Sequence, residues 1–163
     1  MLADVVRLPV PTAVEPRPIR RVLLAFDGSP GAWAALERAI EIAVSQRALL
    51  TIAAVVPEPT VWLGFGPAAL PFTHEMLRRD LERERERTLA AARDEIPATV
   101  SVTTRLLHGR PAAALAALAE SGDYDLVVVG PRPTGLLRRL LQRSVSHRLL
   151  TRSSASVLAV KRG

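Results

Sequence analysis

Two short segments of the chain carry residue types that suit the binding of a phosphate-bearing ligand. Asp27-Gly28-Ser29 follows the apolar run 21–26. The second segment, Gly130-Pro-Arg-Pro-Thr-Gly135, begins at the last residue of the apolar run 125–130. Glycine lets the main chain approach an anion closely, and a serine hydroxyl adds a hydrogen-bond donor. In an open α/β sheet the binding crevice lies beyond the carboxyl ends of the strands. The sequence therefore predicts one cleft that both segments line.

The elements that position these segments alternate between strands and helices. Apolar or alternating runs predict strands over 21–26, 49–56, 99–107, 125–130 and 155–161. Helical spacing of apolar residues predicts helices over 30–44, 73–96, 111–119 and 136–150. Ser29 suits the N-cap of the first helix, and Pro30 suits its first position. This alternation predicts a parallel sheet with right-handed crossovers and helices on both faces.

Two of the predicted strands differ in their place in the sheet. Run 49–56 is apolar on both faces, which predicts a central strand. Run 99–107 alternates Val100, Val102, Thr104 and Leu106 with polar residues. This period of two is typical of a strand with one solvent-exposed face, which predicts a place at the edge of the sheet.

Length and composition favour one cytoplasmic domain. A chain of 163 residues is long enough for a single core. It contains no cysteine, which excludes disulfides and thiolate chemistry, and no window approaches the ~20 apolar residues of a membrane span. Residues 1–18 are rich in proline and predict an extended arm, which leaves 19–163 as the folded domain.

The charged residues have two interpretations. The net charge is +6, and arginine supplies nearly all of the positive charge, which suits nucleotides or nucleic acid. Within 78–87 the arginines alternate with acids, and such a run is typical of a solvated helix face, so we assign it no chemistry. The apolar loop 60–72 covers either the core edge, a ligand site or a partner surface.

Signals of catalysis and of metal binding are absent from the sequence. His74, His108 and His147 are scattered, so no metal site is expected. Neither G-x-S-x-G nor G-x₄-G-K-[ST] occurs, and no acid–base pair can be named. We therefore expect no enzyme, or at most weak ATP hydrolysis.

Three segments together resemble one known family. They are Arg20-Arg-Val-Leu-Leu-Ala-Phe-Asp-Gly-Ser29, Leu107-His-Gly-Arg-Pro-Ala112 and Asp125-Leu-Val-Val-Val-Gly130, and their order and spacing are similar to those of universal stress (UspA-like) proteins. The resemblance implies a three-layer α/β/α, Rossmann-like fold of the adenine nucleotide α-hydrolase type. It further implies five parallel strands in order 3-2-1-4-5 and a homodimer formed through the C-terminal strand.

ATP-binding members of that family carry G-x₂-G-x₉-G-[ST] after the fourth strand. Here the same frame reads Gly130, Pro133, Arg143 and Ser144, so two of the three glycines are replaced. Proline has no N–H to donate to a phosphate, and arginine places a long side chain where the family has none. The resemblance therefore implies a degenerate ATP-binding motif.

Carried over residue by residue, the resemblance places a nucleotide site on six residues. Asp27 would accept a hydrogen bond from the nucleotide, Val55 would lie at the adenine, and the phosphates would contact Gly130, Ser144, Val145 and Ser146. Arg132 could hold an anion electrostatically. Simpler roles stay open, namely turn formation for Asp27, helix capping for the two serines and a solvated basic face for Arg132.

The functional expectation is a binding or regulatory protein in the stress response. Its cofactor would be ATP or another adenine nucleotide with Mg²⁺, bound weakly. One alternative is a nucleotide-independent homodimeric module whose partner docks around Trp62 and Phe65. A nucleic-acid-associated protein is the other, although the chain lacks stacking aromatics and a recognition-helix motif.

Overall fold

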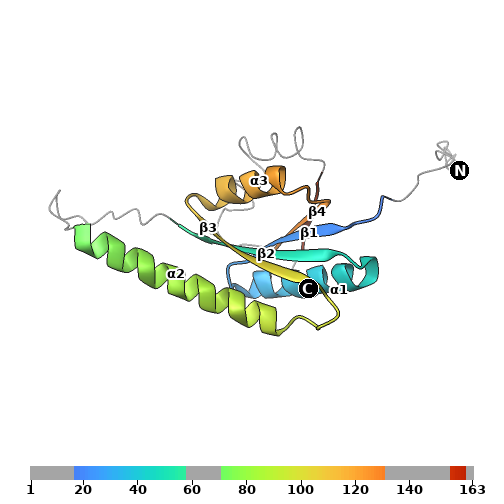
Figure 1. Ribbon diagram of the computed structural model, residues 1–163, viewed down its shortest axis with the longest axis horizontal. Coiled ribbons are helices and arrows are strands. Elements are labelled where there is room, and N and C mark those ends of the chain that lie inside the picture. The colour runs from blue at the N-terminus through green and yellow to red at the C-terminus, as the bar shows by residue number, and fades with distance from the viewer. Residues whose placement is uncertain (1–16, 58–70, 131–154, 161–163) are drawn as a thin grey trace, which may run out of the picture.

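The computed structural model describes residues 17–57, 71–130 and 155–160, and its centre is a parallel sheet. The strands are β1 (Arg21–Ala25), β2 (Leu49–Val56), β3 (Val102–His108), β4 (Leu126–Val129) and β5 (Ser156–Ala159). All neighbours pair in parallel, in the order β3-β2-β1-β4-β5 (Figure 1). The predicted strand order is confirmed.

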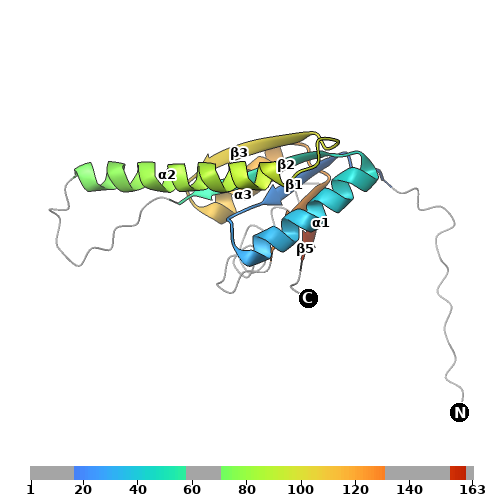
Figure 2. The same ribbon diagram turned by 90° about the horizontal axis from the view of Figure 1, so that it is seen from below.

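Three described helices cover the two faces of this sheet. They are α1 (Pro30–Gln46), α2 (Pro71–Asp94) and α3 (Pro111–Ser121). Figure 2 shows α1 and α2 on one face, and α3 lies on the other. The three-layer α/β/α architecture is therefore confirmed for the described residues. None of these helices is long and apolar enough to cross a membrane.

The core is aliphatic on both faces of the two central strands. On the α1 and α2 face, Val22 and Leu24 pack with Ile52 and with α2 residue Leu89. On the α3 face, Leu23 and Ala53 pack with Leu115. Leu23, Leu24, Leu50 and Ile52 are fully buried. Burial of both faces explains why β1 and β2 read as continuous apolar runs.

Local signals fix the start of α1 directly after β1. The Ser29 side chain caps the helix by accepting a hydrogen bond from the Ala32 N–H at 3.2 Å, and Pro30 occupies the first turn, as predicted. Gly28 has a φ of 79°, a conformation that L side chains rarely adopt. The chain therefore turns sharply from β1 into α1 within the four residues 26–29.

Two elements begin two or more residues away from their predicted starts. β3 begins at Val102 instead of residue 99, because the Val100 N–H bonds to the Pro97 carbonyl in a turn. Thr104, predicted on the inward face, is exposed, as expected of an edge strand with little cover. α2 begins at Pro71, two residues before the prediction. The last two residues of the predicted loop 60–72 belong to α2. The predicted helix 136–150, residues 60–70 of that loop and residues 1–16 of the arm lie outside the described residues.

Candidate functional site

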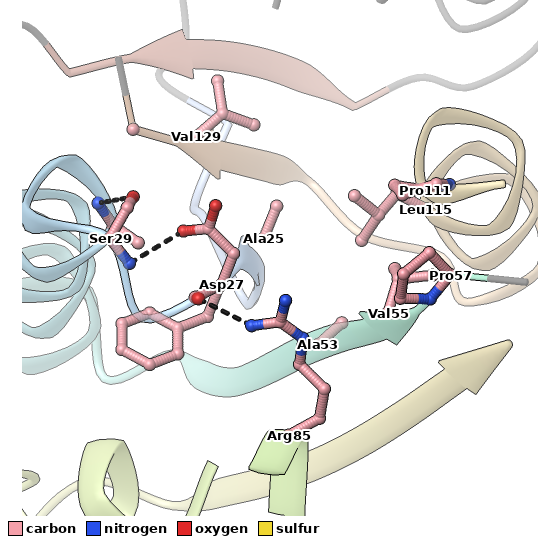
Figure 3. Close-up of a pocket in the computed structure, with 13 residues that line it drawn as sticks. Ala25, Asp27, Ser29, Ala53, Val55, Pro57, Arg85, Pro111, Leu115 and Val129 are labelled. Atoms are coloured by element: carbon pink, nitrogen blue, oxygen red, sulfur yellow. Dashed lines mark hydrogen bonds between the residues drawn. The ribbon is translucent and has the colours of Figure 1, made fainter. Parts of the chain in front are cut away.

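A cavity of about 220 Å³ lies at the carboxyl ends of β1, β2 and β4. Its walls come from the ends of these strands, the first turn of α1, the start of α3 and one residue of α2 (Figure 3). Asp27, Val55 and Gly130, all predicted as site residues, line this one cavity. Arg132, Ser144, Val145 and Ser146 lie outside the described residues.

Most of the described lining is apolar. Val55 and Ala53 come from β2, Val129 from β4, and Leu115 and Pro111 from α3 (Figure 3). Small-molecule sites are commonly built this way, with apolar walls and a few polar groups that fix the orientation of the ligand. Here the charged groups on the walls are Asp27 and Arg85.

The Asp27 carboxylate is held at the turn between β1 and α1. Its Oδ1 accepts a hydrogen bond from the Ser29 N–H at 3.0 Å, which is the pattern of an Asx turn. The turn-forming role that the sequence left open is therefore present. The side chain also lines the cavity, so the two roles do not exclude each other.

Gly130 allows β4 to end against the first turn of α1. A Cβ atom placed there would lie 2.2 Å from the Gly31 carbonyl oxygen and 2.5 Å from the Gly31 carbonyl carbon. These are main-chain atoms, so they cannot turn aside as a flexible side chain would. Glycine at this position therefore has a packing role in addition to the predicted approach to a phosphate.

Arg85 of α2 is a lining residue that the sequence interpretation missed. Its Nη1 donates to the main-chain carbonyl of Asp27 at 2.9 Å, and its Nε is buried with no hydrogen-bond partner. The run 78–87 was predicted to be a solvated helix face, and Arg85 is an exception to that placement because it is partly buried at the cavity wall. A signal was present, because Arg85 lies four residues from both Leu81 and Leu89, on the apolar stripe of the helix.

The rest of the charged run on α2 behaves as a solvated face. Hydrogen bonds from Arg78 and Arg79 hold the pKa of Glu75 below its usual range, and Glu75 in turn raises the pKa of Arg78. Glu82 accepts from Arg78 at 2.6 Å and lies 2.8 Å from His108 of β3. None of these residues lines the cavity, and because their side chains remain accessible to solvent, their ion pairs contribute little to stability.

Comparison with known proteins assigns the chain to a family. A model of the universal stress protein family matches residues 18–161. The chain belongs to the universal stress protein family. This assignment agrees with the resemblance of the three sequence segments and with the observed strand order.

Relatives of this family member are similar along nearly their whole length. A universal stress protein of Thermus aquaticus is 36% identical over 145 residues, which cover 87% of this chain and 98% of the relative. The universal stress protein YxiE of Bacillus subtilis is 30% identical over 146 residues, which cover 86% of this chain and 98% of the relative. The structure also matches a universal stress protein solved in complex with cAMP, at 26% identity and a TM-score of 0.60, over 89% of this chain and 98% of that one.

Proposed function

We propose that this family member is a binding and regulatory protein of the stress response whose cavity takes an adenine nucleotide. The observation that carries the proposal is the meeting of Asp27, Val55 and Gly130 around one mostly apolar cavity. They come from the ends of three neighbouring strands, where an open α/β sheet binds its ligands. The related structure in complex with cAMP supports a nucleotide as the class of ligand.

We further propose that the binding is weak and is not followed by catalysis. In the motif that the resemblance implies, Pro133 has no N–H to donate to a phosphate, and Arg143 has a long side chain where the family has glycine. Asp27 is the one carboxylate among the described lining residues, so these residues offer no second carboxylate to act as partner acid or base. In this proposal Mg²⁺ accompanies the nucleotide.

Isothermal titration of ATP with Mg²⁺ tests the proposal. We expect saturable binding at micromolar strength that weakens at least tenfold in Asp27→Ala, because the ligand loses a hydrogen-bond acceptor (~1.5–3 kcal/mol for a charged one). Glu37→Ala, which removes an exposed acid on α1, is the matched control and should bind as the wild type does. Heat equal to dilution, with no nucleotide released on heating the protein, would instead favour the nucleotide-independent interaction module.

We propose in addition that the chain forms a homodimer through β5. This strand pairs with β4 on one side and ends the sheet of described strands on the other, with Val157 43% exposed. Such an edge presents unpaired main-chain groups to a second copy. We expect light scattering to give the mass of two 17.6-kDa chains for the wild type and of one for Val157→Lys. Val44→Lys, at an exposed valine on α1, should stay dimeric, and a monomeric wild type would refute the proposal.

A further inference from the structure

Arg85 is a cation at the cavity wall that belongs to none of the ion pairs found among the described residues. The described ion pairs involve Arg38, Arg78, Arg79, Arg83 and His108, and Arg85 is in none of them. Its one described hydrogen bond goes to the neutral main-chain carbonyl of Asp27. A partly buried charge is costly unless it is paired.

One hydrogen-bond donor of the Arg85 guanidinium, Nε, has no acceptor among the described residues. This Nε is shielded from solvent, and the lack of a hydrogen-bond partner is unfavourable for a buried donor. Nε and a terminal nitrogen of arginine form a rigid fork that fits two oxygens of one phosphate or carboxylate. Nη1 is hydrogen-bonded to the Asp27 carbonyl, and no described hydrogen bond uses Nε.

The Asp27 carboxylate and the Arg85 guanidinium approach the turn between β1 and α1 from different sides. The carboxylate points toward the start of α1, where it accepts the Ser29 N–H, whereas Arg85 reaches the main-chain carbonyl of the same residue from α2 (Figure 3). The positive end of the α1 dipole also favours the carboxylate charge at that place. The cavity therefore has an acceptor at the start of α1 and, on α2, an arginine Nε without a hydrogen-bond partner among the described residues.

We propose that Arg85 binds the phosphate group of the nucleotide. This inference rests on the proposed function and adds a phosphate contact from α2, on the side of β1 away from β4. It gives the ligand a charged partner in a chain where Pro133 and Arg143 replace two glycines of the phosphate-binding motif. The apolar lining from Val55 and Leu115 would then contact the nucleoside.

The first test compares AMP with adenosine, which differ by the phosphate alone. We expect the wild type to bind AMP about 10- to 100-fold more tightly, since a hydrogen bond to a charged group contributes ~1.5–3 kcal/mol. In Arg85→Met, which keeps the length and apolar stem of the side chain, AMP and adenosine should bind equally. Arg87→Met, an exposed arginine two residues along α2, should keep the preference. An unchanged preference in Arg85→Met would overturn the inference.

A second test separates this inference from the proposed function. Inorganic phosphate is titrated into ¹⁵N-labelled wild-type protein, and the arginine Nε–H signal that disappears in Arg85→Lys is followed by NMR. A saturable shift of that signal with phosphate supports an anion site at Arg85. If AMP does not bind, the nucleotide is ruled out as the ligand and the proposed function fails, but the anion site at Arg85 stands. No shift with phosphate or AMP overturns the inference, and if AMP nevertheless binds, the proposed function stands without it.

Discussion

Replacing Gly130 with alanine is expected to lower the free energy of unfolding by about 3 kcal/mol, at the upper end of the cost of overpacking a core. The added methyl group would lie 2.2 Å from the Gly31 carbonyl oxygen, well inside any van der Waals contact. Relief requires α1 to move away from β4, because both contacting atoms belong to the main chain. That movement would also widen the cavity at its Asp27 side, so nucleotide affinity should fall as well.

Urea denaturation of Gly130→Ala and of Gly109→Ala measures this effect. Gly109 has a φ of 105°, but a methyl group added there would have no atom within 4 Å, so its substitution reports backbone strain without a clash. We expect Gly109→Ala to lose about 1 kcal/mol, the scale of one strained residue. An equal loss of unfolding free energy in the two variants would show that α1 can move away from β4 at little cost, which would contradict the packing role of Gly130.

Filling the cavity should abolish nucleotide binding while the fold persists. Val55→Trp places a bulky ring at the end of β2, in the space that the proposal assigns to the base. We expect at least a ~100-fold loss of ATP affinity, since the ligand would have to displace the ring, and a change in unfolding free energy within the ~1–3 kcal/mol typical of overpacking. Isothermal titration and denaturation measure the two quantities.

The control for this substitution is Val44→Trp on α1. Val44 is 51% exposed and is not a lining residue, so the same ring there should leave ATP affinity unchanged. If Val55→Trp bound ATP as the wild type does, the nucleotide would have to bind elsewhere on the protein.

The order of the elements could be predicted because each depends on local signals. Apolar runs at 21–26 and 49–56 can be buried only inside a covered sheet, and Ser29 with Pro30 marks the helix start within one residue. The edge position of 99–107 followed from its alternation, although the turn at Pro97–Val100 shortened the strand. Such boundaries depend on tertiary contacts and are the least predictable from sequence.

The candidate site was only partly predictable. Asp27 and Gly130 follow strands and were found by that position, whereas Arg85 lies 58 residues from Asp27 in the chain. The alternating charges around Arg85 resemble any exposed helix, and only its spacing to Leu81 and Leu89 indicates an inward position. The packing role of Gly130 required the three-dimensional contact with Gly31, for which the sequence carries no direct signal.

The most direct test of the nucleotide site is an amide ¹H–¹⁵N map of the protein with and without AMP. Our account predicts saturable shifts that are largest for the amides of Asp27, Val55 and Gly130, which come from three strands and meet only at the cavity. Val44 on α1 and Glu95 directly after α2 do not line the cavity, so their amide signals should not shift. Shifts that cluster elsewhere, or no shifts at millimolar AMP, would contradict the account.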